Sequence, residues 1–399
     1  MKKIEYINND PQRGIKYDWK AVRKELKALG IPKEFYNPAT APLALDQWFV
    51  EMSERTVGKT TGWLLAGLVL FEMYGTVTMY IRQVKDMIAP KFSSSLFNVV
   101  VENHYIEKIT NNKYNNVFYK ARKWYLCKVD EETGEILEKC PDYCCCMVSL
   151  DESVNLKSSC NEPTGDLVIF DEFISKKYST RTDEFVSLVD VISTIFRLRE
   201  CGKIVLLANT IDKYSQYLFD LEIFERVAPM ETGDNCSHVT DRGTRIYIEL
   251  VGPPKTYRKK KARWTRLFAG FGKPELASIT GEATWAVKCY QHIPEIEKEE
   301  DTPETLFRNI YIMNNEKLVR LDIMRHPVLG VCIYVHWATV THPDSIIFTT
   351  AARFDPRYIY GLPNSNTAGK FINKALDEQR VYYQANDVGA FVENYILSL

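Results

Sequence analysis

Residues 166–172 read Asp-Leu-Val-Ile-Phe-Asp-Glu, a solid apolar run that ends in two adjacent carboxylates. Such a run is typical of a central parallel strand that is covered on both faces. Placing Asp171 and Glu172 together at its end is costly unless the two acids serve a metal ion or a reaction. The alternative is a helix start, where the helix dipole favours an acidic side chain. That alternative accounts for one acid more easily than for two.

A second segment of interest lies upstream, where residues 53–60 read Ser-Glu-Arg-Thr-Val-Gly-Lys-Thr between a predicted strand and a predicted helix. A phosphate-binding loop needs this context, because its backbone N–H groups and the helix N-terminus cradle phosphates. Gly58 allows close backbone approach, Lys59 would reach the β- and γ-phosphates, and the Thr60 hydroxyl would ligate magnesium. Ser53 replaces the first glycine of the usual pattern. The alternative interpretation is a solvated helix start with Thr60 near the cap.

Together, the two segments predict a site for ATP and Mg²⁺. The predicted nucleotide-binding residues are Ser53, Glu54, Arg55, Thr56, Val57, Gly58, Lys59, Thr60, Thr61 and Asp171. Magnesium would be held by Thr60 and Asp171, and Glu172 would polarise the attacking water as general base. A third strand ends in Asn209, whose side chain would hydrogen-bond the water or the γ-phosphate.

Two further patterns near these strands leave alternatives open. Residues 209–212, Asn-Thr-Ile-Asp, look like a guanine-reading motif without its Lys, but a GTPase would also show Asp-x-x-Gly where Asp171 is followed by Glu-Phe-Ile. Residues 196–199, Phe-Arg-Leu-Arg, end a predicted helix. Arginine neutralises charge in phosphoryl transfer, from the same or a neighbouring subunit. Cations are equally favourable at a helix C-terminus.

The order of elements indicates an α/β protein with more than one domain. The clearest strands are 77–81, 167–170 and 204–208, with a weaker one at 48–52; helices are expected at 59–74 and 184–199, and a hairpin at 123–139. We predict an N-terminal extension over 1–34, an ASCE-type P-loop ATPase domain with a parallel central sheet over 35–252, a small helical basic linker over 253–285, and a second α/β domain over 286–399. In the last region, strands are expected at 310–313, 331–337 and 346–349, followed by helices at 367–379 and 388–397.

Composition is that of an ordinary globular protein, with 45% hydrophobic and 26% charged residues and a net charge of −1. A nucleic-acid surface must therefore be a local patch, such as the basic run 255–266. This run would contact DNA or a neighbouring subunit; the alternative is a plain solvated linker helix. The longest apolar stretch, 63–73, is too short to span a bilayer, so no membrane partner is expected. The ten cysteines predict free thiols in a reducing compartment; Cys140 and Cys144 form only half of a zinc site.

Several segments together resemble the DNA-packaging ATPases of phi-29-type tailed bacteriophages. Residues 35–38 read Phe-Tyr-Asn-Pro before the loop, residues 80–82 read Tyr-Ile-Arg at the next strand, and residues 170–174 read Phe-Asp-Glu-Phe-Ile. The run Phe-Arg-x-Arg-Glu at 196–200 and the strand ending in Asn209 complete the match. The similarity extends over about residues 35–224 and continues weakly through 260–267.

The resemblance implies a viral DNA-packaging motor in the host cytoplasm, acting as a homomeric ring, five-fold in this family, at the portal vertex of a procapsid. Some members dock through a packaging RNA. Arg197 matches a trans-acting arginine finger, and Lys157 falls near a second trans-acting lysine. Lys85 and Lys91 would face double-stranded DNA in the channel. The C-terminal domain would be ribonuclease H-like and inactive, since Asp322, Asp344 and Asp355 form no recognisable metal triad.

Two rival functions remain at this point. A helicase or another nucleic-acid translocase would share the ATP site and need no procapsid. A scaffold that binds nucleotide without hydrolysing it is suggested by Ser53 in place of glycine.

Overall fold

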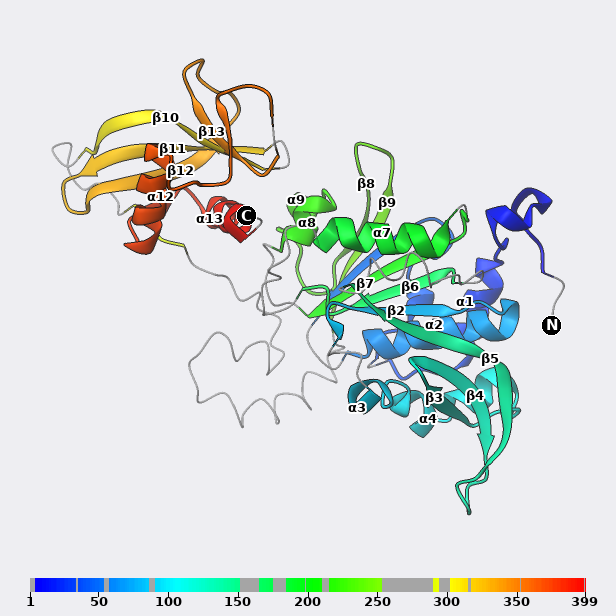
Figure 1. Cartoon of the computed structure of the whole chain (residues 1–399). Coiled ribbons are helices and arrows are strands. Elements are labelled where there is room, and N and C mark those ends of the chain that lie inside the picture. Colours follow the sequence, from blue (N-terminus) through cyan, green and yellow to red (C-terminus); the bar gives the residue numbers. More distant parts are fainter. Residues whose placement is uncertain are drawn as a thin grey trace. The chain divides into compact units, whose positions relative to one another are not determined.

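The computed structural model describes residues 4–33, 35–53, 57–85, 90–150, 165–174, 184–197, 199–209, 215–252, 290–293, 302–314, 317–351, 353–397 and 399. The described chain divides into two compact units (Figure 1). The first is drawn from 1–176, 184–213 and 221–286, and the second from 177–183, 214–220 and 287–399. The domain boundaries drawn from the sequence stay a prediction.

The first unit is built on a nine-stranded sheet in the order β3-β4-β5-β2-β6-β7-β1-β9-β8. The six neighbouring strands β5, β2, β6, β7, β1 and β9 run parallel. Antiparallel strands flank them on both sides, β4 and β3 beyond β5 and β8 beyond β9. The strands are β1 Trp48–Ser53, β2 Thr78–Arg82, β3 Asn116–Lys120, β4 Lys123–Val129, β5 Ile136–Ser149, β6 Leu167–Asp171, β7 Lys203–Asn209, β8 Asn235–Val239 and β9 Arg245–Val251.

The pairing order gathers the predicted functional residues at one edge of this sheet. β7 lies between β6 and β1 and is parallel to both, so the carboxyl ends of the three strands lie side by side. Ser53 at the end of β1 is paired with Asn209 at the end of β7, and Asp171 at the end of β6 is paired with Leu207. Open α/β sheets bind ligands outside the carboxyl ends of their strands.

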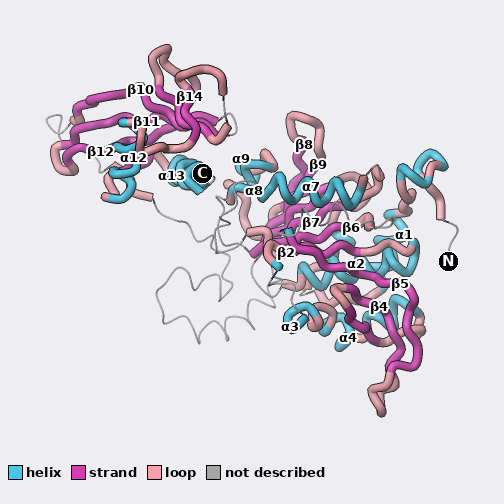
Figure 2. Tube along the Cα trace, viewed as in Figure 1, coloured by secondary structure: helices cyan, strands magenta, loops and turns pink. Residues whose placement is uncertain are grey.

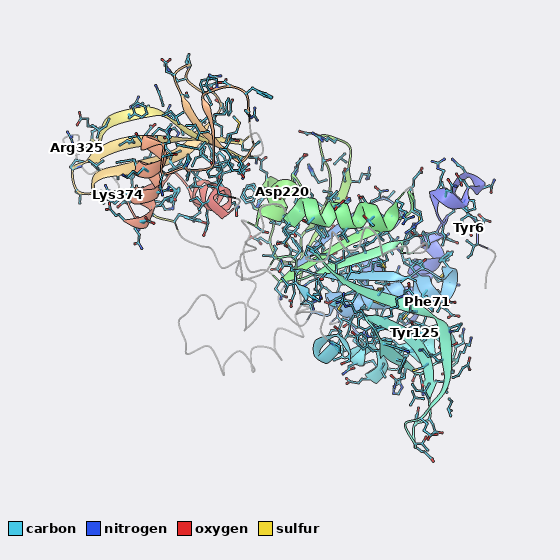
Figure 3. All side chains as sticks on the ribbon, in the orientation of Figure 1. Tyr6, Phe71, Tyr125, Asp220, Arg325 and Lys374 are labelled. Carbon is cyan, nitrogen blue, oxygen red and sulfur yellow. The ribbon has the colours of Figure 1, made fainter. Side chains whose placement is uncertain are left out.

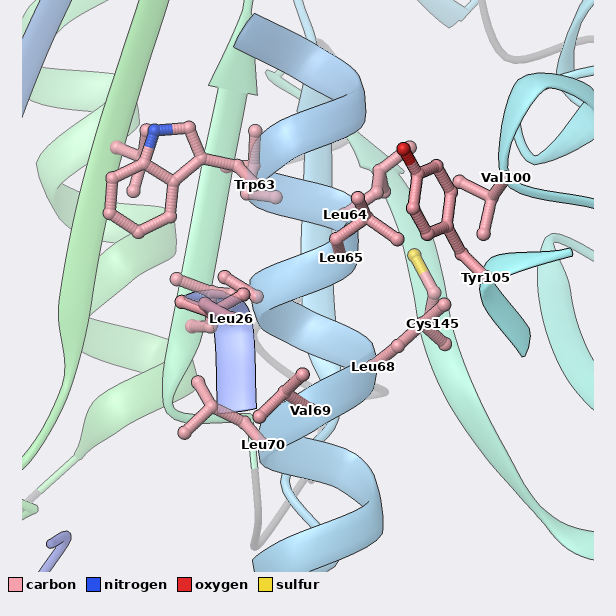
Figure 4. Packing of buried hydrophobic residues seen from close by; sticks show 14 of the residues in the cluster. Leu26, Trp63, Leu64, Leu65, Leu68, Val69, Leu70, Val100, Tyr105 and Cys145 are labelled. Carbon is pink, nitrogen blue, oxygen red and sulfur yellow. The ribbon is translucent and has the colours of Figure 1, made fainter. Parts of the chain in front are cut away.

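Helix α2, Lys59–Tyr74, is the central helix of the unit. Its residues from Gly62 to Leu70 are all buried, as expected for a helix that is apolar on every side. It packs between the sheet and the shorter helices α1 (Trp19–Ala28), α4 (Asn98–Glu102) and α5 (Tyr105–Thr110). Figure 4 shows Leu26 of α1 on one side of α2 and Val100, Tyr105 and Cys145 on the other. On the opposite face of the sheet lies α7, Glu184–Phe196 (Figure 1).

The N-terminal residues are packed into the first unit. Val22 and Leu26 of α1 are fully buried in the same hydrophobic cluster as α2. The preceding segment folds back on itself at the bridge between Tyr6, labelled in Figure 3, and Ile15. The region predicted as an extension therefore contributes to the core of the unit.

The second unit is a six-stranded sheet in the order β14-β13-β10-β11-β12-β15, with two helices against one face (Figure 2). β10, β11 and β12 are antiparallel neighbours, and β13 and β14 continue parallel to β10. The elements are β10 Glu304–Asn314, β11 Lys317–His326, β12 Gly330–Ala338, β13 Ile346–Thr349, β14 Tyr358–Tyr360, β15 Val381–Tyr383, α12 Thr367–Asp377 and α13 Asn386–Leu397. The remaining short helices of the chain are α3 Pro90–Ser93, α8 Gln216–Asp220 and α9 Phe224–Val227.

The predicted strands and helices are confirmed, mostly with shifts of one to three residues at their ends; the strand predicted at 310–313 is the last part of β10, which begins six residues earlier. The helix predicted at 59–74 and the strand predicted at 346–349 have the observed bounds. The predicted hairpin is formed by β4 and β5. The helix predicted at 184–199 ends at Phe196, three residues early, because Arg197 adopts a left-handed backbone with φ 51°. In the described part of the chain, no helix is both long and apolar enough to cross a lipid bilayer.

The contact between α2 and β2 yields a stability prediction. A Cβ atom at Gly67 would lie 2.1 Å from the Thr78 Oγ1. We expect Gly67→Val to lower the free energy of unfolding by about 2 kcal/mol through overpacking. Thr78→Ala in the same chain should restore part of this loss, because the two changes share one contact. Urea unfolding monitored by circular dichroism measures both effects.

The exposed residue Glu72 provides the control for valine in the same helix. Glu72→Val should cost only the difference in helix propensity, about 0.5 kcal/mol. Equal losses for Gly67→Val and Glu72→Val would contradict a close approach of α2 to β2.

Candidate active site

The candidate site lies where β1, β6 and β7 end and α2 begins. Gly58 caps α2 in the left-handed region with φ 83°, a conformation that favours glycine. The backbone there is also crowded, because a Cβ atom on Gly58 would lie 3.1 Å from the Phe35 ring. The Tyr36 N–H donates a 2.9 Å hydrogen bond to the Val57 carbonyl, which ties the segment before β1 to the loop. Val57 and Gly58 are thus held against the segment before β1, at the start of α2.

Lys59, the first residue of α2, points its ammonium toward the end of β1. The residue is 7% exposed, and its Nζ donates a hydrogen bond to the Ser53 Oγ. Burial lowers the pKa of Lys59 to about 8, although the nearby Asp171 and Glu51 carboxyls favour its charged form. A buried cation with one neutral partner is expensive without an anionic ligand. The arrangement is therefore suited to receiving a phosphate.

Asp171 joins the end of β6 to the start of α2. Its Oδ2 accepts a 3.0 Å hydrogen bond from the Thr60 hydroxyl and a hydrogen bond from the Tyr80 hydroxyl of β2. The Arg82 guanidinium lies 3.6 Å from the same oxygen. Burial, together with the Asp171 carboxylate, raises the pKa of Tyr80 well above its ordinary value, so the tyrosine acts as a donor. Asp171 is thereby held in one orientation beside Thr60.

Glu172 follows Asp171 at the strand end, and its side chain is 46% exposed. Its backbone is left-handed, with φ 61°, which is costly for a residue with a Cβ and is found chiefly where function demands it. The Arg82 NH1 lies 2.7 Å from the Glu172 Oε2. Burial opposes the charge on Arg82, but Tyr80, Asp171 and Glu172 together raise its pKa. Arg82 therefore contacts both adjacent acids and fixes the direction in which Glu172 points.

A second buried acid, Glu51 of β1, lies beneath the loop. It is fully buried and accepts hydrogen bonds from the Tyr36 hydroxyl and, at 2.8 Å, from the Trp63 indole N–H. Burial raises the pKa of Glu51 to about 8, while these donors and Lys59 oppose the rise. Its neighbour in register on β9 is Glu249. Glu51 thus links β1, the helix α2 and the segment at Tyr36.

These residues fit a magnesium nucleotide. Thr60 and Asp171 place two oxygen atoms side by side, and oxygen is the ligand type that Mg²⁺ prefers. Lys59 provides a buried cation and the α2 N-terminus provides backbone donors for phosphates. Asn209, half-buried at the end of β7, lies beside Ser53 and completes the polar rim.

Arg197 is not part of this cluster within its own chain. α7 starts near the site, where the Gln83 side chain donates to the Glu184 carboxylate at 3.0 Å. It ends at the opposite edge of the sheet, where the Arg199 guanidinium pairs with Asp166, the residue before β6. The five residues of β6 separate the two edges by about 16 Å. Arg197 is exposed at that far edge.

The other predicted residues have varied outcomes. Thr61 lies in the first turn of α2, and Lys85 is exposed after β2. Lys91 lies in α3, and its side chain is outside the described part of the chain. Glu54, Arg55, Thr56 and Lys157, with the basic run 255–266, also lie outside the described residues.

The cysteine-rich strand β5 is part of the core. Cys144 and Cys145 are buried, and burial raises the pKa of both thiols. The Cys144 Sγ donates to the Trp124 carbonyl at 3.3 Å. Across the described ranges, no group of three or more His, Cys, Asp or Glu side chains is arranged to hold a metal ion.

Sequence reasoning assigned no role to Tyr80, Arg82 or Glu51. In the sequence, Tyr80 and Arg82 stand out only as part of the family resemblance, and their contacts depend on β2 lying next to β6, which no local pattern reveals. Glu51 lies inside the weaker strand predicted at 48–52. The signal that could have found it is an acid inside an apolar run immediately before a phosphate-loop motif.

Comparison with known proteins finds solved structures that share this fold. No family model and no curated protein sequence matches this chain. Among solved structures, the Phi-28 gp11 DNA packaging motor is similar with a TM-score of 0.61 and 15% identity, over 92% of this chain and 98% of that one. The bacteriophage Phi-29 viral genome packaging motor assembly is similar with a TM-score of 0.57 and 17% identity, over 92% and 99% of the two chains. At these identities, the likeness establishes a shared fold.

The buried Glu51 predicts a pH-dependent stability. Its pKa is about 8 in the folded protein against an ordinary value of 4.5, so folding takes up a proton between these pH values. The stabilisation is complete below pH 4.5 and is lost as the pH rises through 8. From pH 5 to pH 8, the free energy of unfolding of the wild type should fall, relative to Glu51→Gln, by roughly 3 kcal/mol.

Urea unfolding at pH 5, 6, 7 and 8 measures this difference. Glu72→Gln, an exposed acid on α2, is the control and should follow the wild type. Parallel profiles for the wild type and Glu51→Gln would show that Glu51 is ionised in the fold throughout.

Proposed function

We propose that this protein is an ATPase that drives double-stranded DNA into a viral procapsid as a homomeric ring. The observation that carries the proposal is the convergence of Lys59, Thr60, Asp171 and Glu172 at one edge of a parallel sheet. The shared fold with two phage packaging motors, over nearly their whole length, supports the choice of this ATPase class.

Each residue of the site has a distinct task. Lys59 and the N–H groups at the α2 start bind the β- and γ-phosphates of ATP. Thr60 and Asp171 hold magnesium, which when bound supplies positive charge against the phosphate oxygens. Tyr80 keeps the Asp171 carboxylate beside Thr60 through its hydroxyl. Ser53, which contacts Lys59, does not remove these interactions although it replaces the usual glycine.

Glu172 is the general base for the attacking water. Its half-exposed carboxylate accepts the water proton, and Asn209 orients the water from the neighbouring strand end. Arg82 pairs with the same carboxylate at 2.7 Å, which holds Glu172 in one direction. Because Arg82 is the last residue of β2, this ion pair links the position of β2 to the orientation of the Glu172 carboxylate.

Arg197 acts on the ATP site of a neighbouring subunit. The length of β6 separates Arg197 from the ATP site of its own chain, so Arg197 serves catalysis only across an interface. Its guanidinium would neutralise the charge that develops on the transferred phosphoryl group. Lys157 is proposed as a second residue acting in trans. Hydrolysis in one subunit then requires its neighbour, which couples subunits around a ring of five.

The cargo is held through its phosphates. Lys85 in the segment after β2, with Lys91 and the basic run 255–266, would contact double-stranded DNA without reading sequence. The ring would dock on the portal of a procapsid in the host cytoplasm, in some cases through a packaging RNA. The alternative, a translocase that needs no capsid, shares every feature of the ATP site, so only an assay with procapsids decides between the two functions.

The first test of the enzyme is Glu172→Gln. The amide cannot take up the water proton, so ATP turnover should fall by about 100-fold or more while nucleotide binding persists. Phosphate release and the fluorescence of a labelled nucleotide measure the two quantities. Glu222→Gln is the matched control, since Glu222 is an exposed acid with a similar backbone, φ 60°. Equal turnover of Glu172→Gln and wild type would remove the general-base role.

The second test addresses action across the interface. Rings of Arg197→Ala or of Lys59→Ala alone should be inactive, the first by about 1,000-fold. Mixed rings should regain turnover, because some interfaces combine an intact Lys59 with an intact Arg197. Turnover is measured after mixed assembly has been verified by native mass spectrometry. Intact mixed rings without recovery would contradict a trans-acting arginine.

The decisive assay combines purified protein, procapsids, DNA and ATP and scores DNA protected from nuclease. Protection that depends on ATP and is lost in Lys59→Ala is the expected result. DNA-stimulated hydrolysis without capsid-dependent protection would favour the general translocase.

A further inference from the structure

The segment that carries Arg197 is fixed by the N-terminal residues of the same chain. We infer that the ion pair between Arg13 and Glu200 positions Arg197 for the neighbouring ATP site, which makes Arg13 and Glu200 positioning residues. This inference rests on the proposed function of Arg197 in trans.

Arg197 itself has little to hold its side chain. It is exposed, and among the described residues its side chain has no hydrogen-bonding or ionic partner. Its N–H donates to the Ser193 carbonyl at 2.8 Å, and its φ of 51° turns the chain out of α7. The direction of the guanidinium therefore depends on how the backbone is held on either side.

On the carboxyl side, the chain is fixed within three residues. The Arg199 guanidinium, 10% exposed, pairs with the buried Asp166 carboxylate and also donates to the Ile195 carbonyl at 2.8 Å. Glu200 receives two hydrogen bonds from Arg13, at 2.8 and 2.7 Å, and its own N–H donates to the Arg13 carbonyl at 2.9 Å. Three contacts from one residue to another define both position and direction.

The N-terminal segment is anchored independently of this pair. The Tyr17 hydroxyl donates to Asp166 at 2.8 Å and lies 2.6 Å from the Thr76 hydroxyl oxygen. Gly14 packs so closely that a Cβ atom there would lie 2.5 Å from the Cys201 Sγ. α1 follows and is buried against α2. Arg13 therefore extends from a fixed support, and not from a free tail.

If the Arg13–Glu200 pair only stabilised the fold, its loss would change the melting temperature and not the catalytic rate. Arg13 and Glu200 are 37% and 50% exposed, and an exposed ion pair contributes little to global stability. Losing it should leave the fold intact. In contrast, even a small displacement of a reacting group lowers the catalytic rate. The two roles therefore separate in catalytic rate and not in melting temperature.

The test measures ATP turnover in the full-length ring. Arg13→Ala and Glu200→Ala should each lower kcat at least fivefold and change KM for ATP less than twofold, with an unchanged melting temperature. The exchanged pair Arg13→Glu with Glu200→Arg should recover at least half of the rate. Lys16→Ala is the matched control, because Lys16 makes an exposed pair with Glu5 at 3.8 Å and should leave kcat unchanged.

Subunit mixing locates the defect. Arg13→Ala subunits should regain turnover when mixed with Lys59→Ala subunits, which supply an undamaged Arg197. They should not regain it with Arg197→Ala subunits, and the double variant Arg13→Ala/Arg197→Ala should be no slower than Arg197→Ala alone.

Each remaining outcome overturns the inference. Unchanged kcat in Arg13→Ala, where Arg197→Ala is impaired, removes the positioning role and leaves the proposed function standing. Loss of ring assembly, or no recovery with Lys59→Ala, places the defect elsewhere. Absence of turnover in the wild type, or full turnover in Arg197→Ala, refutes the proposed function first and the inference with it.

Discussion

The hydrogen bond from Thr60 to Asp171 is the contact on which the site depends. It joins the start of α2 to the end of β6, two points 111 residues apart in the chain. It can form only because β7 occupies the space between β6 and β1, which sets both strand ends at one edge. Tyr80 then reaches Asp171 from β2 on the other side. Four strands are thereby committed to holding a single carboxylate beside a single hydroxyl.

Two buried ionisable side chains near the carboxyl ends of the strands carry an electrostatic cost for the fold. Lys59 is buried with a lowered pKa, and Glu51 is buried with a raised one, so each is destabilised as an ion. Tyr36 and Trp63 reduce the cost for Glu51 by donating to both of its oxygens. A left-handed Glu172 adds backbone strain at the same place. Charge and strain concentrated in one small region are typical of sites whose geometry is set by a ligand and not by stability.

How far the sequence predicts this molecule depends on the range of the interactions concerned. The bounds of α2 follow from local signals, since Gly58 starts the helix and Gly75 ends it in the left-handed region. The apolar runs likewise identify β6 and β7. The position of β2 beside β6, like that of β7 between β6 and β1, is a long-range choice that no local pattern encodes, so the contacts of Tyr80 and Arg82 with Asp171 could not be predicted. The burial of Glu51, in contrast, has a local signal, because this acid lies inside an apolar run immediately before the phosphate-loop motif.

Strand β6 carries an acid at each end. Asp166, just before it, anchors Arg199, and Asp171, its last residue, contacts Thr60. The strand is bonded along its length to β2 on one side and β7 on the other, so it cannot slide without breaking two ladders. It therefore behaves as a rigid strut between the two edges of the sheet. A displacement of Asp166 at one edge is therefore transmitted along β6 to Asp171 at the other edge, because the two strand ladders leave β6 no freedom to shift alone.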